Sequence, residues 1–124
     1  MSVKTFHIDD GQYSLWASAI SCGSDLSITV CGGSAPHIGA VAMGIPRPSL
    51  RQPDKTSASV SVLCVTGHKD DEFARLAAQQ IASRQRCVVS VNVGIHIDDA
   101  NESDILRFQQ NFEHLVADIL ASSV

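Results

Sequence analysis

Three short strings of the form H-x-D-D bring imidazole and carboxylate groups close together: HIDD at residues 7–10, HKDD at 68–71 and HIDD at 96–99. Such groups bind metals, exchange protons and hold polar ligands. The first string runs into Gly11, and Asp-Asp-Gly is typical of a hairpin turn, so His7 is expected to be an ordinary strand residue. The other two strings each follow a long apolar run and precede a predicted helix. They are the two that predict a shared site.

The chemistry of that site has two interpretations. His68, Asp70, His96 and Asp98 would make four metal ligands, although their spacing matches no metal-binding family. Alternatively, the aspartates cap the helices that follow them and the histidines are exposed to solvent. Both interpretations remain open on the residues alone.

Two further stretches could hold an anion. The proline-rich segment at residues 46–57 carries Arg47, Arg51 and Lys55, and an arginine on a stiffened loop suits phosphate. For Arg51 and Lys55 a solvated loop is the simpler expectation. The string GGSAPHIG at residues 32–39 could offer backbone amides to a phosphate or simply form a glycine-rich turn. It is not a G-x-G-x-x-G or P-loop string, so no standard nucleotide-binding motif is present.

These groups must be positioned by elements that hydrophobic periodicity predicts. Alternating patterns predict strands over residues 13–21, 26–33, 37–45, 58–65 and 87–95, with an edge strand near Thr5. Residues 22–25 are a hairpin turn and residues 46–57 a long loop. Helices are predicted over residues 70–86 and 101–120, the second opening on an Asn101/Asp104 capping box. Their buried stripes are Phe73, Leu76, Ala77 and Ile81, and Ile105, Phe108, Phe112, Leu115 and Ile119.

This order predicts an α/β (α+β) fold: a two-layer sandwich in which both helices cover the apolar face of a mixed, mostly antiparallel sheet. The first three long strands would form an antiparallel meander. Strands 58–65 and 87–93, joined through a helix, should run parallel, which places His68 and His96 at the same C-terminal edge. The other face, open to water, a partner or a polar ligand, carries Ser18, Ser27, Thr29, Ser59, Ser61, Ser90 and Asn92.

Composition narrows the class of protein. The 124 residues suit a single domain over 1–124, with 44% hydrophobic and 18% charged residues. A formal net charge of −4 without a basic stripe argues against nucleic acid. The N-terminal sequence leads into no apolar segment, and no apolar run approaches membrane-spanning length, so a cytoplasmic protein is expected. The four cysteines are interpreted as buried thiols rather than a disulfide framework.

Three stretches, APHIGAVAMGIPRPSL, SVSVLCVTGHKDD and VVSVNVGIHIDD, resemble the LpdD-like prenylated-flavin chaperones, the small accessory proteins of UbiD-type decarboxylases. The resemblance runs from the GGSAPHIG segment to the last helix. It implies a fold related to proteasome assembly chaperones and a homodimer. It also implies a protein that is not itself an enzyme. Such a protein binds prenylated FMN, or FMN itself, and protects it for or delivers it to an apo-decarboxylase after a flavin prenyltransferase has made it.

By the same resemblance, the flavin site would be lined by His37, Arg47, Ser49, His68, Lys69, Asp70 and His96. Arg47 and Lys69 would meet the phosphate, and His68 or His96 the polar edge of the ring. Trp16 is expected on a sheet face or at a dimer contact.

Two other functions stay open. A small metal-dependent enzyme would use the His68 and His96 loops to activate water. A structural component or assembly factor of a decarboxylase complex would use the serine-rich face as a protein contact.

Overall fold

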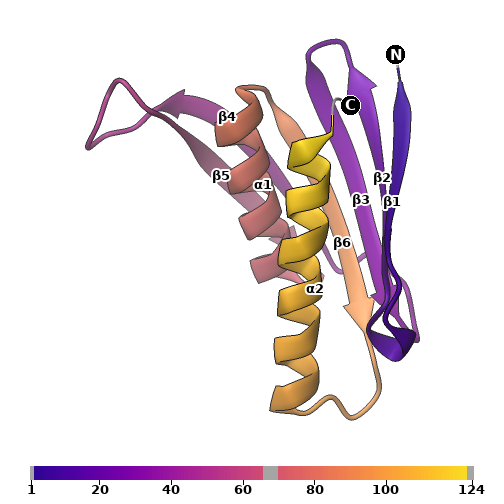
Figure 1. The fold of residues 1–124 in the computed structure, drawn as a ribbon. Coiled ribbons are helices and arrows are strands. Elements are labelled where there is room, and N and C mark those ends of the chain that lie inside the picture. Colours follow the sequence, from indigo (N-terminus) through magenta and orange to yellow (C-terminus); the bar gives the residue numbers. More distant parts are fainter. Residues whose placement is uncertain (1, 66–69, 123–124) are drawn as a thin grey trace.

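The computed structural model describes residues 2–65 and 70–122, which fold into one six-stranded sheet with two helices on one face (Figure 1). The strand order is β1-β2-β3-β6-β4-β5. In chain order the elements are β1 (Val3–Ile8), a 3₁₀ turn η1 (Gly11–Tyr13), β2 (Leu15–Cys22), β3 (Asp25–Gly33), β4 (Ala40–Pro48), β5 (Thr56–Cys64), α1 (Asp71–Gln85), β6 (Val89–His96) and α2 (Glu102–Ala121). The predicted two-layer architecture is confirmed.

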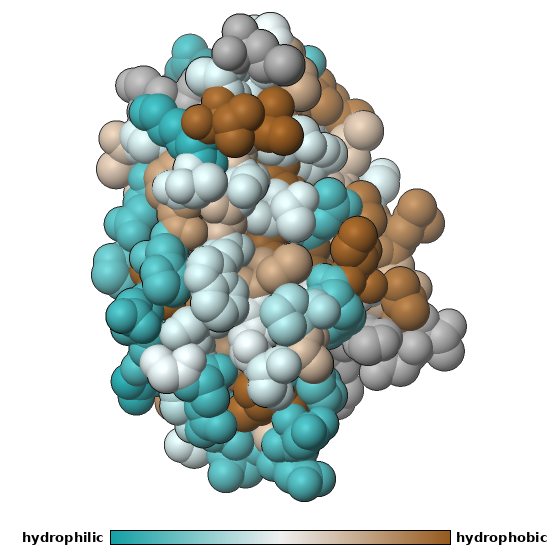
Figure 2. All heavy atoms as spheres, turned by 90° about the vertical axis from the view of Figure 1, so that its right-hand side faces the viewer, coloured by the Kyte–Doolittle hydropathy of each residue, from teal (hydrophilic) through white to brown (hydrophobic). Residues whose placement is uncertain are grey.

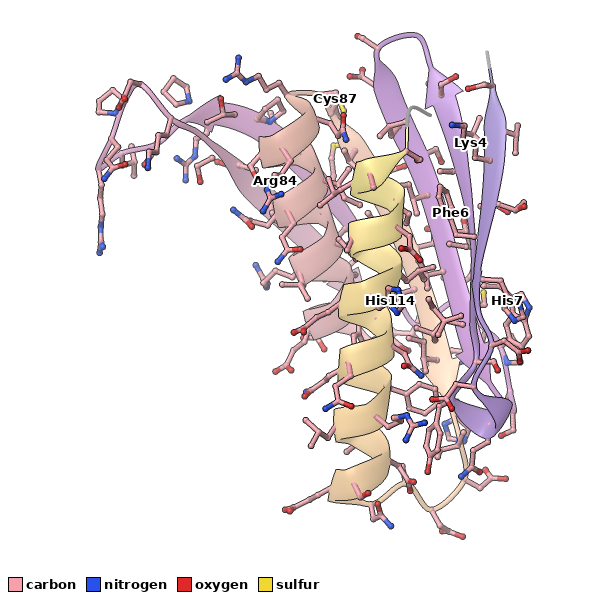
Figure 3. All side chains as sticks on the ribbon, viewed as in Figure 1. Lys4, Phe6, His7, Arg84, Cys87 and His114 are labelled. Carbon is pink, nitrogen blue, oxygen red and sulfur yellow. The ribbon has the colours of Figure 1, made fainter. Side chains whose placement is uncertain are left out.

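Period-two alternation decides which face of each strand is buried. Leu15, Ala17 and Ala19 of β2 are buried while the residues between them are exposed, and β3 and β6 alternate in a similar way. Figure 3 shows the consequence on β1, where Phe6 lies on the helix side and His7 points away from the helices. The apolar side chains of the sheet thus face the helices, with α1 packed on β4, β5 and β6 and α2 packed on β1 and β2.

The strand order differs from the predicted meander. β6 lies between β3 and β4, pairing parallel to β3 and antiparallel to β4. The expected pairing of the third long strand with the second is therefore wrong, because periodicity reports the buried face of a strand and not its neighbour. The expected parallel direction of β5 and β6 is confirmed, with β4 between them.

The segment at 46–57, predicted to be a long loop, is strand at both ends and a loop only over residues 49–55. β4 continues to Pro48 and β5 begins at Thr56, with Pro46 paired to Ala58 and Pro48 to Thr56. β6 pairs with β4 only as far as Gly44, so beyond that point one edge of β4 has no strand partner and proline is tolerated there. The β4–β5 arm, residues 45–59, projects past α1 at the upper left of Figure 1.

The helices follow the predicted stripes, except that Phe73 and Leu76 of α1 are only partly buried and Ile105 of α2 is exposed. Phe108, Phe112, Leu115 and Ile119 of α2 are buried, but Ile105 is 46% exposed because α2 extends beyond the start of α1 (Figure 1). The capping box is present: Asp104 N–H donates to Asn101 Oδ1 at 2.9 Å, and Asn101 N–H to Asp104 Oδ2 at 3.0 Å. No helix of the described chain is both long and apolar enough to cross a membrane.

The first H-x-D-D string anchors α2 instead of forming a two-residue hairpin turn. Asp10 accepts two hydrogen bonds from Arg107, at 2.6 and 2.7 Å, and a third from Asn111 at 2.9 Å. Tyr13 in η1 donates to Asp104 at 2.5 Å. His7, as expected, is a strand residue, stacked on Trp16 with ring centroids 5.3 Å apart. This string is structural.

The open face of the sheet carries the small polar residues that the sequence analysis assigns to it. Ser27 pairs with Ser90 and Thr29 with Asn92 across β3 and β6, and Asn92 donates to Thr29 Oγ1 at 3.2 Å. Trp16, as expected, lies on a sheet face, at an exposed position of β2. Figure 2, which faces the right-hand side of Figure 1, shows pale side chains across the middle, with hydrophobic ones near the top and along the right-hand margin.

The cysteines depart from their prediction. Cys87 is buried and Cys31 half-buried, whereas Cys22 and Cys64 are exposed. Cys22 ends β2 at the hairpin turn and Cys64 is the last residue of β5, so neither lies in the interior that its apolar neighbours suggest.

Candidate functional site

His37, Asp70 and His96 meet at the C-terminal edge of β6. His37 Nε2 lies 3.0 Å from Asp70 Oδ2, and the rings of His37 and His96 pack edge to face with centroids 6.3 Å apart. His37 Nδ1 lies 2.9 Å from the Ala35 carbonyl oxygen. Both ring nitrogens of His37 therefore face oxygen atoms, which fixes the plane of the ring. We name His37, Asp70 and His96 the His37 cluster.

Asp70 occupies a position that its place in the sequence does not reveal. It is 3% exposed, and its Oδ1 accepts a hydrogen bond from Ile95 N–H at 2.9 Å. The Gly39 N–H donates to Val93 O, so beyond Gly39 the β6 backbone has lost its β4 partner and the Asp70 carboxylate takes that place. Asp70 was predicted as a helix cap or a ligand, but its side chain makes no cap hydrogen bond to α1. Instead, the Asp70 carboxylate accepts a hydrogen bond from the backbone N–H of Ile95 near the end of β6.

Three glycines allow this close packing. A Cβ on Gly39 would collide with the Asp70 carboxylate, and one on Gly94 would collide with the His37 carbonyl oxygen. Gly33, at φ 77°, occupies the left-handed region and would place a Cβ on the His96 carbonyl. The string GGSAPHIG therefore folds back over the end of β6 and carries His37 against Gly94. Its backbone packs on protein instead of forming an isolated turn.

The other predicted site residues are placed differently. His96 is the last residue of β6, at the predicted edge, and its Nε2 lies 3.1 Å from Asp98 Oδ1. His68 and Lys69 lie outside the described residues. Arg47 and Ser49 are on the β4–β5 arm, where Arg47 donates to Ser59 Oγ at 2.8 Å and to the Pro48 carbonyl at 3.1 Å. Along β4, Ala40 and Arg47 are about 23 Å apart at about 3.3 Å per residue. One chain does not bring Arg47 to the His37 cluster.

A groove of about 980 Å³ opens beside the cluster, between the N-terminal ends of α1 and α2. Helical periodicity predicts that most of its apolar lining belongs to the core. These side chains face the groove because the start of α2 extends beyond α1. The sequence indicates this extension, since the second predicted helix is longer than the first. The apolar lining consists of Phe73, Leu76, Ile95, Ile97, Ile105 and Phe108.

The rim of the groove is acidic, with Asp71, Glu72, Asp99 and Glu113 around it and Asp70 behind. No lysine or arginine is among the described residues that line it. Carboxylates at this density repel an anion, so the groove suits the neutral, apolar part of a ligand and not a phosphate. Burial, with a smaller contribution from the Asp70 carboxylate, raises the pKa of the nearby Cys31 thiol. That shift keeps Cys31 protonated and weakens it as a nucleophile.

The metal interpretation finds no ligand set in the described part of the chain. Asp98 contacts His96, whereas Asp70 is engaged by His37 and the Ile95 N–H. No group of three or more His, Cys, Asp or Glu side chains among residues 2–65 and 70–122 is arranged to hold a metal ion. What the cluster and groove offer is a set of fixed hydrogen-bonding groups beside an apolar surface, which is the composition of a small-molecule site.

The fold is shared with a class of assembly proteins. The chain is similar to a solved chain from a chaperone complex for yeast 20S proteasome assembly, with a TM-score of 0.59 and 20% sequence identity over 97% of this chain and 96% of that one. This likeness confirms the expected fold class. No curated protein matches the sequence.

The sequence places the chain within a family. Residues 9–123 match the prenylated flavin chaperone LpdD-like domain. The protein belongs to that family, as the strings APHIGAVAMGIPRPSL, SVSVLCVTGHKDD and VVSVNVGIHIDD predicted.

Proposed function

We propose that this chain, acting as a single domain over residues 1–124, binds prenylated FMN and protects it for, or delivers it to, an apo-decarboxylase of the UbiD type, without chemistry of its own. Family membership over residues 9–123 is the observation that carries the proposal. A flavin prenyltransferase would supply the cofactor. The geometry adds reasons of its own.

The groove suits the ring system and prenyl group of such a ligand. Its volume of about 980 Å³ and its apolar lining resemble sites for ligands of this size. His96, which lines the groove and has a side chain 44% exposed, would donate to the polar edge of the isoalloxazine. The groove is open to solvent along the two helices, so the ligand would leave without unfolding its carrier.

The phosphate requires a different place. The acidic rim excludes it from the groove, and the described cation from the predicted set is Arg47, on the arm. Within the described residues Arg47 makes no ion pair with a carboxylate, and its hydrogen bonds go to Ser59 and the Pro48 carbonyl. Its guanidinium keeps donors available for an anion.

The proposal is tested by purifying the protein without oxygen after co-expression with a flavin prenyltransferase, and recording its absorption and ligand mass spectra. We expect prenylated FMN at close to one per chain. His96→Ala should weaken binding about tenfold, the cost of one ligand hydrogen bond. His114→Ala is the matched control, since His114 is also exposed but lies outside the groove on α2. A colourless wild-type protein that takes up no added cofactor would overturn the proposal.

A further inference from the structure

Four carboxylates around the groove have no cationic partner in the described part of the chain. Two lie in the first turn of α1, one in the loop before α2 and one on α2 itself: Asp71, Glu72, Asp99 and Glu113. We call these four residues the acidic rim. The ion pairs within residues 2–65 and 70–122 all use other carboxylates. The start of each helix contributes about half an elementary positive charge, so two helix starts offset only part of four carboxylates. The rim stays negative and favours a cationic partner.

The floor of the groove, inside the acidic rim, is apolar and in part open to solvent. Phe73 and Leu76 of α1 are only partly buried, and so is Ile95 of β6. Ile105 of α2 is 46% exposed, because α2 continues past the start of α1 (Figure 1). An exposed apolar surface that is bordered by polar groups marks a contact with another molecule.

An apolar floor inside a ring of carboxylates selects one kind of protein partner. An acidic segment would bring like charges together at the rim, which opposes binding. The flavin ring fills the apolar floor, but it leaves the carboxylates of the rim without cations. A protein segment with lysine or arginine beside apolar side chains suits both parts of the groove. Its apolar side chains fill the floor, as in other recognition of a segment by a hydrophobic groove, and its cations meet the rim.

We propose that the groove is also the docking site for a segment of the protein that accepts the cofactor, and that this segment carries lysine or arginine beside apolar side chains. The inference rests on the proposed function, because the flavin ring and the segment fill the same apolar floor. The two therefore exclude each other, and docking of the acceptor releases the ring from its carrier. By linkage, bound flavin weakens binding of the segment by the same factor as the segment weakens binding of flavin.

The chemistry of the segment is tested without flavin, by selecting a random linear peptide library on the purified chain. The selected peptides should combine apolar residues with an excess of lysine and arginine. The double variant Glu72→Lys, Glu113→Lys should lose that preference, because reversing two of the four carboxylates leaves a rim without net charge. Asp9→Lys, Asp54→Lys is the matched control: it makes the same change of charge at exposed positions outside the groove, and should select the wild-type peptides. No selected peptide, or peptides without an excess of positive charge, overturns the inference.

The place of docking is tested by titrating one selected peptide, followed by its fluorescence anisotropy. The double variant of Glu72 and Glu113 should bind it about tenfold more weakly, and the difference should shrink at high salt, because the rim is exposed. Ile105→Ser should also weaken binding, since it removes part of the apolar floor. Leu106→Ser is the matched control, because Leu106 is 54% exposed on the same helix but does not line the groove. Equal effects of the two serine variants would place the peptide outside the groove and overturn the inference.

The exclusion is tested by equilibrium dialysis of prenylated FMN against the chain with and without the selected peptide. Saturating peptide should weaken flavin binding by about tenfold or more. Simultaneous binding of peptide and flavin at unchanged affinity would overturn the shared occupancy. If the chain binds basic peptides in the groove but takes up no flavin, the proposed function fails and the docking result stands on its own. If flavin binds and no basic peptide is selected, the inference alone fails.

Discussion

Asp70 shows how much a single buried side chain holds together at the edge of the sheet. It joins three segments distant in sequence: the loop at His37, the start of α1 and the end of β6. The sequence predicts that Asp70 and His96 share an edge, because both follow strands of the same direction. The family resemblance assigns His37 to the same site, but strand order alone does not predict its contact with Asp70, since that depends on β6 entering the sheet beside β4.

Removing that carboxylate should be costly. Asp70→Ala would leave the Ile95 N–H and His37 without this partner, and a buried donor left unsatisfied costs about 1–3 kcal/mol. The free energy of unfolding from urea titration should fall by that amount. Asp71→Ala, at the neighbouring half-exposed position, should change it by less than about 0.5 kcal/mol. Equal effects of the two substitutions would mean that the carboxylate of Asp70 is not structural.

The ion pair at Asp10 predicts how stability depends on pH. The guanidinium of Arg107, with the amide of Asn111, lowers the pKa of the Asp10 carboxyl. A group whose pKa is lower in the folded state adds stability above its unfolded pKa, and that stability is lost as the pH falls through the folded value. Asp104 contributes to stability with the same pH dependence, because the hydrogen bonds that it accepts from Asn101 and Tyr13 lower its pKa.

Melting temperatures measured from pH 7 to pH 3 should therefore separate the wild type from Asp10→Asn at neutral pH and converge in the acid range. The convergence should begin below about pH 4. Asp9→Asn, one residue away at an exposed position, should leave the wild-type profile unchanged. Parallel curves for wild type and Asp10→Asn would contradict the assignment.

At the scale of elements, local sequence patterns predict most helices and strands and the face that each one buries. They do not predict which strands are neighbours in the sheet. The Asn101/Asp104 capping box and the serine-bearing face were predictable because each depends on residues near one another in the chain. The extension of β4 through Pro46 and Pro48 was not, because proline breaks a strand only where a neighbour needs its N–H. That β6 stops pairing with β4 at Gly44 is a property of the assembled sheet.

The cap of α2 gives a prediction at this scale. Asn101→Ala removes the acceptor for Asp104 N–H and should lower the free energy of unfolding by about 1 kcal/mol. Ser103→Ala, an exposed change in the same first turn, serves as control. Amide hydrogen exchange should also quicken in the first turn of α2. An unchanged exchange rate there would show that the Arg107–Asp10 pair, not the cap, fixes the helix start.

For the molecule as a whole, the groove and the core share a wall. Phe73 lines the groove and packs on the fully buried Phe112 with ring centroids 4.8 Å apart. Helical periodicity predicts Phe73 in a buried stripe, and only the offset between the two helices turns its outer edge toward the groove. Packing and ligand binding are therefore coupled through one aromatic contact.

Phe112→Ala should lower the free energy of unfolding by about 3–5 kcal/mol and, by releasing Phe73, weaken flavin binding as well. Leu106→Ala, on the outer side of α2, should alter neither. Urea titration and flavin fluorescence titration of the two variants separate the effects. A Phe112→Ala protein with unchanged affinity would show that the groove wall is held independently of the core.

The position of β6 in the sheet has a consequence for synthesis. β6 pairs with β3 across about sixty residues of sequence, and it is the strand that joins the β1–β3 ribbon to the β4–β5 hairpin and α1. Before residue 96 has emerged from the ribosome, the β1–β3 ribbon and the β4–β5 hairpin cannot pair through β6. Their apolar faces remain uncovered until then. This uncovered apolar surface makes the nascent chain prone to aggregation.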